Sequence, residues 1–558
     1  MTILFFKKYW IWCAVLVQAI LLYLLIVGVA SPGVIWVVFG LLAVAMLALP
    51  SHVGLKLFLV HIPFYLVLPQ QYSDTLSMWR PLAALLFLRM LAEYVSTYAY
   101  AYVQTLVPIR LSIFFGIPKK MGNTWRGLLW WERIAVGLFG WGVVSLLWAQ
   151  FFGEGVKQLL FLLNAALVYP VVLWVLRDRS RIVELLRAGA ASTGIIILLG
   201  FVQYGITLFV TAYYFWQFWA LQVASLYYGT TLARVLQYSN SWVTVQGEEK
   251  VLRMFSIMPS SHAFAMVCVL FLAFVLPLLF VSPYNEKMTA VKNALSFVSV
   301  RRSLGVWVGV ALAMLALILS GTRGVWAGML PAVAVAGLLY WRSRVRHVIA
   351  PVLAAMLLVL VLFEASPLID RTAAWVRHGG FGQGTLDRVV SIIDTDETSN
   401  AGRLDMWKRA ARQIVKNPVG VGHGNFITTI ASGDNYDSAA NQDNQEYNLP
   451  QRYVTAHSLY LQLLVELGVV GFLLFCGFWL AWFWDAYKAL YSARLPELEA
   501  VLLATAGVMF VWFLAYGIFD LTWLNDKILL YTFLLLGLIR VTSSSSVEAK
   551  PGVGQISN

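Results

Sequence analysis

Long apolar stretches separated by short polar connections run through most of the chain. A helix needs about 20 apolar residues to cross the hydrocarbon core of a bilayer, and most of these stretches are about that long. The third one below is short, which leaves a tilted helix, a re-entrant helix or no span at all as alternatives. The predicted spans are residues 9–30, 34–50, 55–69, 81–107, 134–150, 157–176, 188–212, 263–282, 304–321, 325–341, 348–364, 458–484, 497–519 and 526–541.

The basic residues between these stretches indicate how the chain crosses the membrane. In multi-pass proteins lysine and arginine collect in the cytoplasmic connections. Alternation then places both termini in the cytoplasm and two long polar segments, 213–262 and 365–456, on the outer side. The basic connections are at residues 7–8, 110–133, 177–187, 287–302 and 342–346.

Composition agrees with a lipid environment. Of 558 residues, 60% are hydrophobic and only 12% are charged, and a water-soluble domain has no way to bury so much apolar surface. A net charge of +13 would suit nucleic acid, but the basic residues lie in clusters between the spans, so we expect no nucleic-acid partner. The cysteines lie within apolar runs, which argues against disulfides and structural zinc.

We expect an all-α fold, a polytopic transmembrane helical bundle of about 14 spans with a large helical outer loop. Within that loop, apolar residues recur at helical spacing over 403–416 and charged residues lie opposite them. This pattern predicts an amphipathic helix, ended by Asn417-Pro418, that lies on the membrane or caps the bundle. A glycine-rich turn, 419–426, follows it.

The chain therefore divides into consecutive parts, with no separate soluble domain. The predicted parts are an N-terminal transmembrane bundle over 1–364 that includes the outer segment 213–262, the outer loop 365–457, C-terminal transmembrane helices over 458–541, and a disordered cytoplasmic tail over 542–558.

Two arginines on the outer side are candidates for anion binding. Arg323 lies between two spans, where an arginine is costly unless it is paired or binds an anion. A snorkelling arginine at a tight turn explains it equally well. Arg403 begins the amphipathic helix, where its guanidinium and the helix dipole both attract phosphate oxygens. The alternative there is a solvated surface arginine.

His457 lies at the point where the outer loop enters an apolar helix, so it is expected at the membrane surface. A histidine near neutral pKa beside two arginines suits a general base, and the alternative is an interfacial histidine without a chemical task. Glu466 is nine positions on, about half a turn round and roughly 13 Å deeper, so it cannot pair directly with His457. Gln462 is placed to hydrogen-bond Glu466, which makes a structural role at least as plausible as a chemical one.

Further outward-facing residues are weaker binding candidates, namely Arg253, His262 and His423. Asp394 and Asp396 form a D-x-D pattern, but such a pattern occurs readily by chance in an acidic stretch. Arginines neutralise a diphosphate without metal. We therefore expect neither a metal site nor a cofactor.

Several short motifs resemble the bacterial O-antigen ligase and polymerase superfamily of membrane glycosyltransferases in order, spacing and placement, across about 303–485. Residues 253–265 are similar to an upstream element of that family. One departure is Ser458, where family members often have asparagine. The motifs are Ser320-Gly-Thr-Arg323-Gly, Gly402-Arg403 followed by Trp407, Pro418 with Gly420-Val-Gly422, and Ala456-His457-Ser through Glu466-Leu-Gly468.

The resemblance implies a GT-C-like bundle in the bacterial inner membrane with its active site on the periplasmic face. Arg323 and Arg403 would bind the diphosphate of a polyprenyl-diphosphate-linked oligosaccharide donor, and His457 would activate the acceptor hydroxyl for inverting, metal-independent transfer. Beyond what the resemblance implies, Trp407, Glu466 and the three weaker candidates above are our further candidates for substrate binding.

The acceptor is the main question that the sequence leaves open. A polymerase would join repeat units into an exopolysaccharide or O-antigen, with polysaccharide-assembly proteins as possible partners. A ligase would transfer glycan to lipid A core or to protein. We favour the polymerase because of the many spans and the second outer segment. A transporter or flippase would instead carry its unusual charges at mid-membrane.

Overall fold

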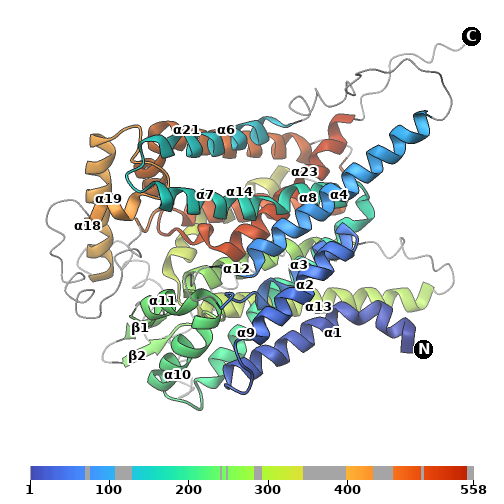
Figure 1. The fold of residues 1–558 in the computed structure, drawn as a ribbon, viewed down its shortest axis with the longest axis horizontal. Coiled ribbons are helices and arrows are strands. Elements are labelled where there is room, and N and C mark those ends of the chain that lie inside the picture. Colours follow the sequence, from blue (N-terminus) through green and yellow to red (C-terminus); the bar gives the residue numbers. More distant parts are fainter. Residues whose placement is uncertain are drawn as a thin grey trace, which may run out of the picture.

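The computed structural model shows a bundle of long helices (Figure 1). It describes residues 2–69, 76–106, 128–238, 242–246, 249–281, 292–342, 398–431, 456–491 and 495–548. The bundle is formed by α1 (Thr2–Ile26), α2 (Val34–Ala48), α3 (Ser51–His61), α4 (Trp79–Leu106), α6 (Trp130–Ser145), α7 (Phe152–Ala166), α8 (Val168–Val175), α9 (Ile182–Ile206), α12 (Ser261–Val275), α13 (Lys292–Leu319), α14 (Arg323–Arg342), α21 (Leu459–Leu490), α22 (Glu497–Tyr516) and α23 (Asp526–Glu548).

The predicted fold class, a helical membrane bundle, is confirmed. Within the described residues, 6 helices are long and apolar enough to cross a membrane, and shorter apolar helices accompany them. The predicted count of about 14 spans stays a prediction, and the span expected over 348–364 lies outside the described residues. Strand pairing in the described part is confined to one isolated bridge and one antiparallel hairpin, β1 (Val243–Gln246) with β2 (Glu249–Leu252).

Several of the predicted spans differ in detail from the helices observed; α13, for example, begins at Lys292 and not at 304. The short third stretch forms α3, whose 11 residues rise only about 16 Å, too little to cross a core of about 30 Å. The stretch 157–176 is divided into α7 and α8, and Pro170 falls in the first turn of α8, where its missing N–H is tolerated. The last helix continues beyond 541 to Glu548, because serines extend an existing helix at little cost.

The innermost helix of the bundle is α12. Nearly all of its side chains are buried, and its phenylalanines pack against glycines of α9. A methyl group on Gly200 would lie 2.8 Å from the ring of Phe264. The small residues of α9 therefore let the two helices approach closely.

The described parts of both segments predicted to be outer lie at the same end of the bundle, opposite the N-terminus, and we call this the outer end (Figure 1). This end carries α10 (Ala212–Phe218), a π-helix η5 (Trp219–Ala224), α11 (Ser225–Tyr238), the β1–β2 hairpin, α18 (Thr398–Lys416) and α19 (Phe426–Ala431). The prediction that the segments 213–262 and 365–456 share one side agrees with this arrangement for the parts described.

Helix α18 contains the predicted amphipathic helix and ends, as expected, before Asn417-Pro418. Its Met406 and Ala410 are buried with Phe426, Ala456 and Val465. Through Met406 and Ala410, α18 therefore caps the bundle at the start of α21, while Leu404 and Val415 of the same helix stay exposed.

Candidate active site

Charged side chains from distant parts of the chain meet at the outer end of the bundle. His262 lies in the first turn of α12, and the charges of Arg253, Arg403, His457 and Asp520 all act on it. Of the predicted candidates, the structure thus brings Arg253, His262, Arg403 and His457 together. Three basic side chains and a carboxylate around a histidine make a site suited to a phosphorylated substrate.

His457 is held in place by the end of α22. Two residues after it, the N–H of Leu459 donates to the Gly517 carbonyl at 2.7 Å. The hydroxyl of Tyr460 donates to the Leu514 carbonyl at 2.6 Å. These bonds fix the start of α21 against the segment that carries Tyr516 and Asp520.

The backbone and the electrostatics of His457 are both unusual. Its φ is +45°, in the left-handed region that non-glycine residues rarely adopt, and such strain is common at functional sites. The side chain is exposed, yet the surrounding protein disfavours its charged form. Desolvation of the imidazole by the surrounding protein is the main cause that lowers the pKa of His457, and the positive charge of Arg403 lowers it further. The negative charge of Asp520 acts in the opposite direction and raises it. The imidazole is therefore neutral near pH 7 and able to accept a proton.

His262 belongs to a polar group that the sequence reasoning did not assemble. Its Nδ1 shares a hydrogen bond of 2.7 Å with the hydroxyl of Tyr516 and lies 3.9 Å from Oδ2 of Asp520. Asp520 directly follows the predicted span 497–519 on the outer side, so its predicted position in the topology could have identified it as a candidate site residue. Tyr516 lies in an apolar helix among many aromatic residues, and nothing in its sequence context marks it as a site residue.

The segment before α12, which presents Arg253, is fixed by the buried Gln203. Its Oε1 accepts hydrogen bonds from the N–H groups of Phe255 and Ser256 at 3.1 and 2.6 Å, and its Nε2 donates to the Ser256 carbonyl at 3.1 Å. These bonds hold Ser256 at a φ of +54°. In addition, the Met254 N–H donates to the Leu319 carbonyl at 3.0 Å, which joins this segment to the end of α13.

Arg323 begins α14, directly after the turn that faces Arg253. Gly321 in this turn has a φ of +60°, and a methyl group there would lie 3.6 Å from Cγ of Arg253. The Thr322 hydroxyl donates to Ser261 at 3.5 Å, next to His262. The backbone of Arg323 therefore starts beside the site, while its side chain lies outside what the structure describes.

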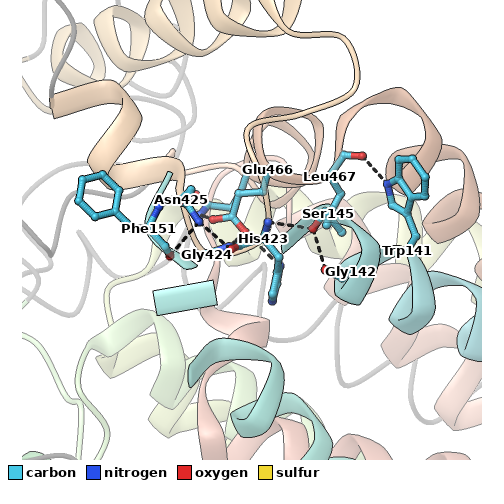
Figure 2. Close-up of polar contacts among 10 residues, drawn as sticks. Trp141, Gly142, Ser145, Phe151, His423, Gly424, Asn425, Glu466 and Leu467 are labelled. Carbon is cyan, nitrogen blue, oxygen red and sulfur yellow. Dashed lines mark hydrogen bonds and ion pairs between the residues drawn. The ribbon is translucent and has the colours of Figure 1, made fainter. Parts of the chain in front are cut away.

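His423 and Glu466 lie in a buried network with α6 and the start of α21 (Figure 2). Glu466 accepts hydrogen bonds from Gln462 Nε2 at 2.5 Å and from the Gly424 N–H at 2.9 Å, and its Oε2 lies 3.2 Å from Nδ1 of His423. The His423 N–H donates to Ser145 at 3.0 Å. The predicted bond between Gln462 and Glu466 is confirmed. With 8% and 4% of their surfaces exposed, His423 and Glu466 are placed for a structural role.

The glycine-rich turn docks against a break in α21, and we call this contact the turn clamp (residues 418–425 with 465–469). The N–H groups of Val421 and Gly422 donate to the carbonyls of Val465 and Glu466, each at 2.9 Å. Gly468 has φ +66° and ψ −169°, a conformation essentially restricted to glycine. At this break the Val469 N–H donates to the Pro418 carbonyl at 2.9 Å. Helix α21 is thereby divided into a short outer part and a long inner part.

Trp407 positions the end of the outer loop. Its indole N–H donates to the Ala456 carbonyl at 3.0 Å, directly before His457. Asp394 and Asp396 lie outside the described residues. Among the residues that are described, no group of three or more His, Cys, Asp or Glu could hold a metal ion.

Comparison with known proteins gives a family match for part of the chain. Residues 308–476 match the family model described as O-antigen ligase, and this match confirms the predicted resemblance to the O-antigen ligase and polymerase superfamily. The matched region contains Arg323, Arg403 and His457, whereas Arg253, His262 and Asp520 lie outside it. No curated protein matches the chain.

Proposed function

Because residues 308–476 match the O-antigen ligase family model and the chain has several apolar helices long enough to cross a membrane, we propose that the chain is a membrane glycosyltransferase. Its donor is a polyprenyl-diphosphate-linked glycan, bound at the periplasmic face of the bacterial inner membrane. The observation that supports this most directly is the convergence of Arg253, Arg403, His262, His457 and Asp520 at the outer end of the bundle.

The proposed reaction is a single displacement at the anomeric carbon. The acceptor hydroxyl gives its proton to neutral His457 while its oxygen forms the new bond to the anomeric carbon. The bond from that carbon to the diphosphate oxygen breaks, and polyprenyl diphosphate leaves with the electron pair. Attack opposite the leaving group inverts the anomeric configuration.

Positive charge on the protein takes the place of a metal ion in this proposal. The guanidinium groups of Arg253 and Arg403, together with that of Arg323, neutralise the diphosphate as it leaves. After proton transfer, the carboxylate of Asp520 stabilises the imidazolium of His457, on which its charge acts. The hydrogen bond between Tyr516 and His262 keeps the second histidine oriented beside that carboxylate.

For the acceptor, we propose that repeat units are polymerised. The second outer segment, which forms α10, α11 and the β-hairpin, lies at the same end as α18 (Figure 1) and adds surface on which a growing glycan can lie. Polysaccharide-assembly proteins are the expected partners. Ligation to lipid A core or protein is the second candidate, favoured by the description of the matching family. Charges gathered at one end, and not at mid-membrane, argue against a transporter.

The function is tested with purified protein in detergent and a polyprenyl-diphosphate oligosaccharide. We expect release of polyprenyl diphosphate that depends on an acceptor and persists in the presence of a metal chelator. Offering a second lipid-linked repeat unit or lipid A core as acceptor separates polymerase from ligase. If neither acceptor supports release, the proposal is wrong.

The pKa of His457 predicts how the rate depends on pH. Since the pKa lies below its ordinary value of 6.5, kcat/KM should fall only at pH values below 6.5, where the free base becomes protonated. Arg403→Gln removes a positive charge that lowers this pKa, so the fall of kcat/KM at low pH, the acid limb of the pH profile, should move to higher pH. Asp520→Asn removes a negative charge that raises this pKa, so the acid limb should move to lower pH.

The matched control is Lys408→Gln, which removes an exposed cation from the same helix, α18. Its acid limb should coincide with that of the wild type. Shifts of the same sign in Arg403→Gln and Asp520→Asn would contradict the assignment of His457 as the titrating base.

A further inference from the structure

A second group of charged side chains lies at the start of α23 and is not part of the site described above. Lys527 is only 2% exposed, and Arg80 near the start of α4 is half-buried. Among the described residues, Asp526 is the carboxylate that lies within ion-pair distance of Lys527, with 3.8 Å between Oδ1 and Nζ. The charge of Asp526 also acts on Arg80. Two cations thus share one carboxylate.

Aromatic rings hold both cations in place. Nζ of Lys527 lies 5.4 and 5.2 Å from the ring centres of Tyr227 and Tyr228. Both phenol groups are fixed by hydrogen bonds to backbone carbonyls, at 3.0 and 2.6 Å. The guanidinium of Arg80 lies 5.2 Å from the ring centre of Phe161, and its Nε is buried without a hydrogen-bond partner. These rings orient the cations, but ring faces carry no net charge.

The charges in this group do not balance. The oxygens of Asp526 already accept hydrogen bonds from the Trp79 indole at 3.0 Å and from the Lys527 N–H at 2.8 Å. With both cations protonated, the group carries one positive charge more than negative charge, and the burial of Lys527 makes an unneutralised charge unfavourable there. Guanidinium and ammonium groups are the side chains that bind phosphate oxygens in proteins. A bound phosphate would neutralise the group.

This group lies close to the first site. Asp520 lies on the connection between α22 and α23, and Asp526 begins α23. Six residues span at most about 20 Å. The Tyr228 hydroxyl donates to the carbonyl of Ile257, which lies between Arg253 and His262 in the chain. Both sites therefore lie toward the outer end of the bundle, within reach of two substrates that react with each other.

We propose that Arg80 and Lys527 bind the phosphate head group of a second membrane-anchored substrate, the acceptor. The inference rests on the proposed polymerase function, in which two lipid-linked glycans must lie side by side while one is transferred to the other. The arginines of the first site hold the donor diphosphate, and the second site holds the acceptor diphosphate so that the acceptor hydroxyl reaches His457. No bond forms or breaks at the second site.

The test counts bound molecules of polyprenyl diphosphate without glycan, by native mass spectrometry of the full-length protein in detergent. Wild type should bind two molecules per chain, and Lys527→Met should bind one, because the apolar replacement fills the same space without charge. Lys527→Arg should restore two. Lys56→Met, which removes a lysine paired with Glu184 elsewhere in the bundle, should bind two. Thermal unfolding checks that each variant is folded.

One bound molecule in the wild type, or two in folded Lys527→Met, would overturn the proposal. Anionic phospholipid offers the same phosphate chemistry, so the count is repeated with equimolar phosphatidylglycerol. If the phospholipid displaces the Lys527-dependent molecule, the head group bound there comes from the bilayer and the acceptor assignment is wrong. Binding is measured without turnover, so a failure of the proposed glycosyl transfer would appear only in the release assay.

Discussion

Replacing His457 by alanine or asparagine should lower the release of polyprenyl diphosphate by about 10²- to 10⁴-fold, the usual contribution of a general base. Asparagine is the better probe, because it tolerates the left-handed backbone at this position yet accepts no proton in the neutral pH range. Donor binding should persist in both variants, since Arg253 and Arg403 remain. The loss should therefore appear in kcat and not in the affinity for the donor.

His52→Ala is the matched control for this experiment. His52 lies at the start of α3 among Lys56, Arg181 and Glu184 and makes no contact with the first site. It should retain wild-type turnover. If His457→Asn also releases polyprenyl diphosphate at the wild-type rate, another group takes the proton and the assignment of His457 is wrong.

Gly468→Ala should disrupt the turn clamp and destabilise the outer end of the protein. A methyl group at this position would lie 2.5 Å from the Pro418 carbonyl oxygen and closer still to the backbone of Val419. The backbone conformation is also restricted to glycine. Strain and overlap each cost about 1–3 kcal/mol, so the free energy of unfolding should fall by ~3 kcal/mol or more.

The measurements are thermal unfolding and limited proteolysis between α18 and α21. Gly477→Ala is the matched control on the same helix, because a methyl group there would meet only Ile134 at an ordinary distance of 3.9 Å. Gly477→Ala should be as stable as the wild type. Equal stability of the two variants would show that the turn clamp contributes nothing to the fold.

The helical bundle was predictable because apolar stretches of this length favour helices that can cross a bilayer. Most of the helices observed overlap predicted stretches, although several of their ends differ, as at α13. What composition could not show is where an apolar stretch divides. The division between α7 and α8 depends on Pro170, and the short α3 depends on tertiary packing that buries its whole surface from Leu57 to His61.

The candidate site was predictable only in part. Arg403 and His457 were found from the motifs and from their position on the outer side, and both lie in the charged group observed. The reasoning that separated His457 from Glu466 assumed a continuous helix from His457, whereas the helix begins at Leu459 and is broken at Gly468. The conclusion nevertheless agrees with the structure, because the partners of Glu466 are Gln462, Gly424 and His423.

Asp520 and Lys527 were missed for a common physical reason. Each lies beside an apolar stretch without a recognisable motif, and its importance comes from neighbours that are distant in sequence. The partners of Lys527, Tyr227 and Tyr228, come from a different outer segment. Such groupings depend on how the helices pack, and helix packing cannot be inferred directly from a single sequence.

The anchoring of the outer loop on both sides bears on how the position of His457 depends on the length of that loop. Ile430, before residues 432–455, and Ala456, after them, belong to the same buried cluster, and Ala456 is also bonded to Trp407. The two attachment points therefore have a fixed separation that does not depend on the length of the chain between them. Changes in length between Ile430 and Ala456 therefore need not move His457, because both attachment points are fixed by contacts outside that stretch.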